Sequence, residues 1–158
     1  MKRMLVAVAM ACMTGCGGAP VDIAKAVDAK VVTSGWLPAE ASGGRNKNVP
    51  AIAVTLKNVS GATLNALQLN AVFRLVSSND ELASDFRPIA GPSGLPAGGS
   101  TGKIALKASR GYTGTDPVDD LLRNSKFVDA KVELFVKAGS GQWTRVGEFP
   151  IARQFTGN

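Results

Sequence analysis

An alternation of apolar and polar residues, broken by short runs of glycine, asparagine and serine, is the feature that most constrains this chain. The alternation is clearest over residues 128–137 and recurs over residues 51–57, 67–75, 103–108 and 143–155. A period of two sends successive side chains to opposite faces of a strand, and frequent turn residues favour antiparallel connections. The pattern predicts an all-β fold, an antiparallel β-sandwich of about seven strands. Pro150 in the last segment predicts an edge position or a bulge there.

Residues 111–124 interrupt this pattern and carry the signals of a short helix. Asp116 suits the N-cap, and Pro117 suits the first helical position because proline has no backbone N–H. Asp119 and Asp120 follow near the positive end of the helix dipole, and Asn124 can end the helix. We therefore expect one short helix in a connection that crosses from one sheet edge to the other.

The N-terminus carries the signals of an exported protein. Two basic residues precede an apolar run over residues 4–13, which has the length of a signal-peptide core and is too short to span a bilayer. The run ends in Met13-Thr14-Gly15-Cys16, which resembles the lipobox of bacterial lipoproteins, although that family usually has leucine in place of Met13. The resemblance implies cleavage before Cys16 and a lipid on its thiol. An ordinary signal peptide, a cytosolic protein with an apolar start, and Cys12 as the lipidated residue are the alternatives.

The lipobox resemblance divides the chain into a signal peptide (residues 1–15), a lipid-anchored linker (16–29) and a β-sandwich domain (30–158). Within the linker, residues 21–29 could form a short helical turn or a ragged first strand. Gly17 follows the cysteine where aspartate would favour the inner membrane. The family's sorting rule therefore implies the outer membrane, facing the periplasm, if the host is Gram-negative. Membrane lipid, bound through Cys16, is the first expected partner.

Part of the expected sandwich resembles a known family. Residues 49–109 contain a strand ending in Asn58-Val59-Ser60, an alternating strand with Phe73, and a later Leu95-Pro96-Ala97-Gly98 loop. These features resemble the FxLYD-type and related immunoglobulin-like accessory domains of bacterial envelope proteins. Arg74-Leu75-Val76 departs from that family, which has Leu-Tyr-Asp after the phenylalanine. The resemblance implies an immunoglobulin-like β-sandwich with an interaction or accessory role, and it assigns no functional residue.

The composition excludes several kinds of chemistry. The 158 residues include no histidine, so a Ser-His-Asp triad and a histidine-ligated zinc are excluded. With Cys16 lipidated and Cys12 removed, no cysteine remains for catalysis, a metal or a disulfide. The net charge of +6 is spread along the chain and falls to +4 without the two basic residues of the signal peptide. We expect a protein that is not an enzyme, with no catalytic residue, cofactor, metal or nucleic-acid partner.

Two groups of carboxylates remain as candidates for chemistry; they are Asp80, Glu81 and Asp85, and Asp116, Asp119 and Asp120. Either group could bind calcium, and two groups that faced one cleft could serve a hydrolase. Neither spacing matches an EF-hand loop, and nothing in the sequence brings the groups together. We interpret the first group as turn chemistry and the second as helix capping.

Three aromatic residues are the candidates for partner contact. Tyr112 lies in a loop, where it could contact a partner or cover the core. Trp143 and Phe135 lie on the face of the last hairpin opposite the core residues, either exposed or covered by residues 111–124. The sequence thus predicts a membrane-anchored lipoprotein whose non-catalytic domain binds a cell-envelope protein. A small-ligand or calcium-binding envelope lipoprotein is the alternative.

Overall fold

The computed structural model describes residues 21–40 and 43–156, so the expected signal peptide and Cys16 lie outside the described residues. These residues form eight strands and two short helices. In chain order the elements are α1 (Ile23–Ala26), β1 (Val27–Ala39), β2 (Asn46–Asn58), β3 (Leu67–Leu75), β4 (Glu81–Ala90), β5 (Ile104–Lys107), β6 (Tyr112–Gly114), α2 (Val118–Leu121), β7 (Ala130–Ala138) and β8 (Thr144–Pro150). Neither helix is long and apolar enough to cross a membrane.

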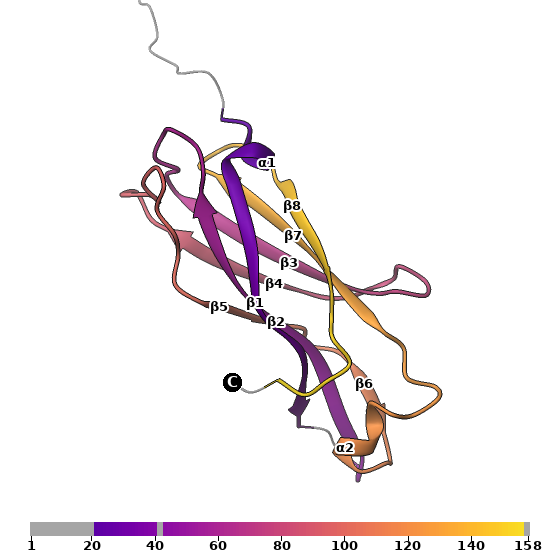
Figure 1. Cartoon of the computed structure of the whole chain (residues 1–158). Helices are drawn as coiled ribbons and strands as arrows, with labels where there is room; N and C mark the ends of the chain where they lie inside the picture. Colours follow the sequence, from indigo (N-terminus) through magenta and orange to yellow (C-terminus); the bar gives the residue numbers. More distant parts are fainter. Residues whose placement is uncertain (1–20, 41–42, 157–158) are drawn as a thin grey trace, which may run out of the picture.

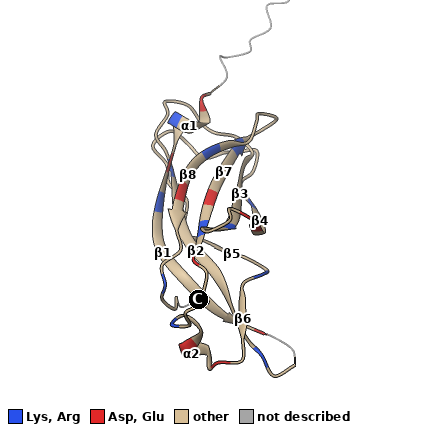
Figure 2. Ribbon diagram, turned by 90° about the vertical axis from the view of Figure 1, so that its right-hand side faces the viewer, with Lys and Arg blue, Asp and Glu red and all other residues tan. Residues whose placement is uncertain are grey.

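The strands form two antiparallel sheets that pack on each other (Figure 1). One sheet has the order β1-β2-β5, with β6 paired to the first residues of β2, and the other has the order β4-β3-β7-β8. The two layers are also visible in Figure 2, which is turned by 90°. The predicted antiparallel all-β sandwich is confirmed, with eight strands in place of about seven and two short helices in place of one. Pro150 ends β8, which is an edge strand as its proline predicted.

The core lies between the sheets and consists of the residues that the period of two selects. From β2, β3 and β7 it takes Ile52, Val54, Leu56, Leu67, Leu69, Ala71, Phe73, Ala130, Val132, Leu134 and Val136, all at most 2% exposed. Burying each larger side chain contributes about 1.5–3 kcal/mol. Trp36 of β1 is 1% exposed, and its ring lies 4.6 Å from that of Phe127. The alternation therefore predicted the central strands because both sheets bury one face.

The folded domain begins earlier than residue 30. Ile23 and Ala26 of α1 are buried in the core cluster, and β1 starts at Val27, which is 4% exposed. The backbone N–H of Val59 also donates to the carbonyl of Ala26 at 2.8 Å. Residues 23–29, assigned to the linker from the sequence, therefore belong to the sandwich. They form both of the structures considered for them, a helical turn followed by a first strand.

The expected helix in residues 111–124 is a single turn, α2, and its N-cap is Pro117 rather than Asp116. The carboxylate of Asp116 instead accepts a hydrogen bond from Nδ2 of Asn124 at 2.6 Å. This bond joins the chain before α2 to the chain after it, so the aspartate makes a loop contact and does not cap the helix. The buried Leu121 and Leu122 fix the segment to the domain.

One buried amide, that of Asn58, connects two turns at the α1 end. Its Nδ2 donates to the carbonyls of Ala62, Leu95 and Pro96, at 2.8, 2.9 and 3.1 Å. Its Oδ1 accepts from the backbone N–H and the hydroxyl of Ser60. The asparagine is fully buried, and these bonds satisfy its polar atoms. The Asn58-Val59-Ser60 turn and the Leu95-Pro96 loop are therefore held by one side chain.

Candidate functional site

The outer face of the β4-β3-β7-β8 sheet carries three aromatic side chains, Phe86, Phe135 and Trp143, which we call the aromatic patch. The register aligns Phe86 of β4 and Phe135 of β7 on either side of Asn70 of β3. Paired residues share a face of the sheet, so the two rings lie on the side away from the core. Trp143 immediately precedes β8, next to β7. Neighbouring strands therefore build this patch.

Trp143 makes two contacts that fix it over the sheet. Its ring lies edge-on to that of Phe86 with centroids 6.2 Å apart. The Nζ of Lys137 lies 5.2 Å from the centroid of the tryptophan ring, a cation–π distance. Trp143 nevertheless remains 40% exposed and Phe86 51% exposed, while Phe135 is half-buried. Exposed aromatic area held in one place is typical of a protein-contact surface.

Phe86 was not found from the sequence because no strand was expected over β4, where Asp85 had been interpreted as turn chemistry. Asp85 pairs with the core residue Ala71 and faces inward, and Phe86 faces outward. The inward carboxylate of Asp85 accepts the backbone N–H of Lys107 in β5 at 3.0 Å and pairs with Arg87 at 3.0 Å. An edge strand can hold such inward charges because they reach the opening between the sheets. The sequence shows that residue 86 is aromatic, but contacts of β4 with β3 and β5 decide which side of the sheet it faces.

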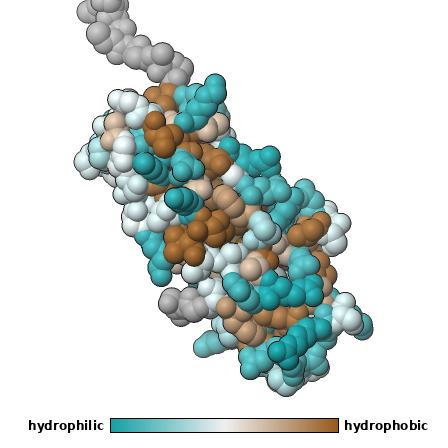
Figure 3. Space-filling view, in the orientation of Figure 1, coloured by the Kyte–Doolittle hydropathy of each residue, from teal (hydrophilic) through white to brown (hydrophobic). Residues whose placement is uncertain are grey.

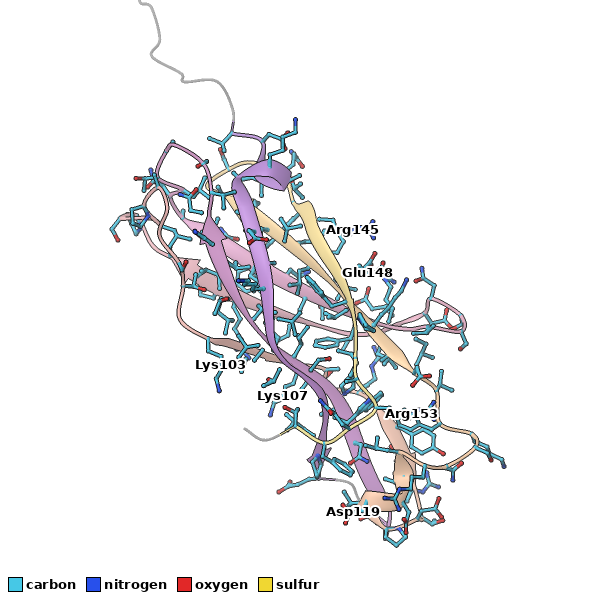
Figure 4. All side chains as sticks on the ribbon, in the orientation of Figure 1. Lys103, Lys107, Asp119, Arg145, Glu148 and Arg153 are labelled. Atoms are coloured by element: carbon cyan, nitrogen blue, oxygen red, sulfur yellow. The ribbon has the colours of Figure 1, made fainter. Side chains whose placement is uncertain are left out.

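Beside the aromatic patch, the same face carries a network of ion pairs. Glu133 accepts from Nε of Arg74 at 2.7 Å and from Nη1 of Arg145 at 2.9 Å. Arg145 and Lys131 also pair with Glu148, at 3.2 and 3.4 Å. The hydrogen bond from Arg74 is the main cause that lowers the pKa of Glu133; partial burial opposes it, and Arg145 adds to it. The labelled Arg145 and Glu148 in Figure 4 show where β8 contributes to this network.

Tyr112 lies far from the aromatic patch, at the α2 end of the molecule (Figure 1). Its ring is half-buried and packs 5.1 Å from that of Phe127, which belongs to the core. The helix α2 packs against β2 and β6. Residues 111–124 therefore do not cover the patch on the other sheet. The structure brings Phe135 and Trp143 to one face and leaves Tyr112 apart from them.

The two groups of carboxylates do not converge. Among the described residues, no three Asp, Glu, His or Cys side chains lie close enough to hold a metal ion. In the first group, Asp80 accepts from Ser78 within its turn, at 2.6 Å, and Glu81 lies 3.8 Å from Arg74. In the second, Asp120 lies 3.9 Å from Arg123, and Asp119 is exposed.

Comparison with known proteins identifies no family. No family model matches the chain, and no curated protein matches it. A solved structure described as the X-ray structure of Northeast Structural Genomics Consortium target SoR45 is similar over 82% of this chain and 89% of its own. The two chains are 9% identical, with a TM-score of 0.49.

Proposed function

We propose that this protein is a lipid-anchored protein of the cell envelope whose β-sandwich binds a partner protein through the aromatic patch and has no catalytic role. The observation that supports a binding role most directly is the exposed pair of Phe86 and Trp143. Burying aromatic side chains of this size is a main source of binding energy at protein interfaces. The neighbouring ion pairs are already satisfied, so the partner need not neutralise them.

The anchor part of the proposal rests on Cys16 and on the end of the domain that follows it. Four residues lie between Cys16 and Val21, and the five steps from one residue to the next span at most about 18 Å. Val21 leads into α1, at the end where the β7–β8 hairpin turns (Figure 1). A lipid on Cys16 would hold this end near the bilayer, in the outer membrane facing the periplasm if the host is Gram-negative. The long faces of the sandwich would then be open to a partner from the side.

Photocrosslinking in intact cells tests the partner proposal. A benzophenone amino acid in place of Phe86 should give a defined protein adduct that disappears when Trp143→Ala is added. The matched control carries the same amino acid in place of Arg123, which is exposed next to α2, away from the outer faces of both sheets. Equal adducts from both positions, or an adduct that survives Trp143→Ala, would contradict a binding role for the patch.

The anchor is tested separately. Cys16→Ser should abolish incorporation of radiolabelled palmitate and move the protein from the membrane fraction to the soluble fraction. A protein that stays membrane-bound and labelled after Cys16→Ser would disprove the anchor while leaving the patch untouched.

A small-ligand or calcium-binding envelope lipoprotein is the alternative proposal. A groove on the outer face of β2 and β5 has a volume of about 190 Å³, and a wider hollow between the start of α1 and the β7–β8 turn has a volume of about 610 Å³. Pockets for drug-sized ligands usually measure about 300–1,000 Å³, so the first is small for such a ligand and the second is large enough. A calcium-dependent or ligand-dependent rise in melting temperature would favour the alternative.

A further inference from the structure

A groove on the outer face of the β1-β2-β5 sheet, extending to Arg87 of β4, is a second surface, which the proposed function does not use. Its floor is formed by small side chains, Ala51, Ala53 and Ala105, which face away from the core. Lys103 and Lys107 stand on the same side of β5 as Ala105, two residues before and after it. We call this surface the basic groove. Figure 3 shows hydrophobic surface on this side of the molecule, bordered by hydrophilic side chains.

Within residues 21–40 and 43–156, the lysines of the basic groove have no ion-pair partner. Both are exposed, and neither forms an ion pair with any described residue. Asp85, which approaches β5 from β4, is 13% exposed and already binds Arg87 and the backbone N–H of Lys107. Glu40 lines a neighbouring pocket with Lys107 but forms no ion pair with it. Figure 4 shows the two labelled side chains leaving β5 toward solvent. The part of the chain that the structure describes therefore leaves these two positive charges without an ion pair.

The spacing of these charges fits an extended chain. Residues four apart in a strand are separated by about 13 Å, and an extended peptide repeats at the same interval. Acidic side chains four residues apart on such a peptide would meet Lys103 and Lys107 in turn. Ala53 and Ala105 carry only methyl groups, so the floor between the two lysines leaves room for a peptide backbone. A flat bilayer surface does not fill a concave floor in this way.

We propose that the basic groove binds an extended acidic segment of a partner protein. This goes beyond the proposed function, because it concerns the opposite sheet and requires neither the aromatic patch nor the lipid. The carboxylates pair with Lys103 and Lys107, and the small side chains between them pack on the alanine floor. Because the lysines are exposed, salt weakens the interaction.

The test measures fluorescence anisotropy with the full chain in detergent micelles. The probe is a labelled nine-residue peptide with glutamate at its first, fifth and ninth positions and alanine, threonine and valine between them. The wild-type protein should bind this peptide and not its glutamine counterpart. Lys103→Glu with Lys107→Glu should weaken binding by about tenfold or more, since two attractions become repulsions. Arg45→Glu with Lys126→Glu, an equal charge change outside the groove, should leave the affinity unchanged.

A second variant tests the shape of the groove independently of its charge. Ala105→Phe fills the floor at an exposed position without changing any charge, so it should also abolish binding while the melting temperature stays the same. Trp143→Ala should leave peptide affinity unchanged. Failure of the peptide to bind, or equal weakening by both charge-reversal pairs, would overturn the proposal without affecting the aromatic patch. If short-chain phosphatidylglycerol stabilises the wild type through the two lysines and the peptide does not bind, the groove holds a lipid headgroup and the proposal is wrong.

Discussion

The outer faces of the two sheets use their charged residues in opposite ways. On the β4-β3-β7-β8 face, Arg74, Lys131 and Arg145 all pair with glutamates of the same face. On the β1-β2-β5 face, Lys103 and Lys107 remain unpaired among the described residues. The first face leaves aromatic area as its main means of binding, and the second leaves charge. Binding at the aromatic patch should therefore depend little on salt, and binding at the basic groove should fall as salt rises.

The largest effect should come from a residue that belongs to neither face. Tyr112→Ala removes a half-buried ring that packs on Phe127, and we expect a loss of about 2 kcal/mol in the free energy of unfolding. Urea unfolding followed by the fluorescence of the buried Trp36 measures it. An unchanged stability with weaker partner binding would break the two-face comparison, because it would make the α2 end a third binding surface.

The next largest effect should come from the paired face. Glu133→Gln replaces the carboxylate shared by Arg74 and Arg145, and we expect a loss of about 1–2 kcal/mol at neutral pH. Because folding lowers the pKa of Glu133 from its ordinary value of 4.5, its contribution is present above that value and is lost as the pH falls through the lower, folded-state pKa. The stability difference between wild type and variant should thus shrink on acidification. A difference that persists at low pH would show that the network does not act through this charge.

A smaller effect on stability should come from the aromatic patch. Trp143→Ala removes an exposed ring with one aromatic and one cation–π contact, so about 0.5 kcal/mol is expected. Thermal unfolding checks the stability, and the crosslink from position 86 checks binding. A large stability loss would indicate that the tryptophan is structural and would remove the patch from the comparison.

The smallest effect should come from the unpaired face. Lys103→Glu with Lys107→Glu breaks no ion pair described in the fold, so unfolding should change by less than about 0.5 kcal/mol. The same urea titration, run beside that of Glu133→Gln, gives the sharpest form of the comparison. A loss similar to that of Glu133→Gln would mean that the lysines already have a stabilising role.

The sequence predicted those elements whose side chains alternate between a buried and an open face. This held for β2, β3 and β7, where the inward residues form the core. The prediction failed where contacts with residues distant in the sequence decide whether a side chain is buried. The start of the domain was missed because the polar Asp22, Lys25 and Asp28 separate the buried Ile23, Ala26 and Val27.

The candidate site could be predicted only in part for the same reason. Phe135 and Trp143 lie in one hairpin, so their shared face followed from the alternation. Phe86 comes from β4, a strand that is distant in sequence and was not expected, in which Asp85 faces inward and Phe86 outward. The spacing of Lys103 and Lys107 was visible in the sequence, but that neither lysine pairs with a described carboxylate depends on how the two sheets meet.

The edges of both sheets have a consequence for how crowded copies of this protein behave. Three of the edge strands contain a proline; these are Pro38 in β1, Pro88 in β4 and Pro150 in β8. On the edge strand β5, the carboxylate of Asp85 occupies the N–H of Lys107 that an incoming strand would need. Interrupted edges of this kind resist strand-to-strand association and amyloid-like growth. If the proposed lipid anchor holds molecules side by side on a membrane, their edges would thus not join, and their broad faces would stay open.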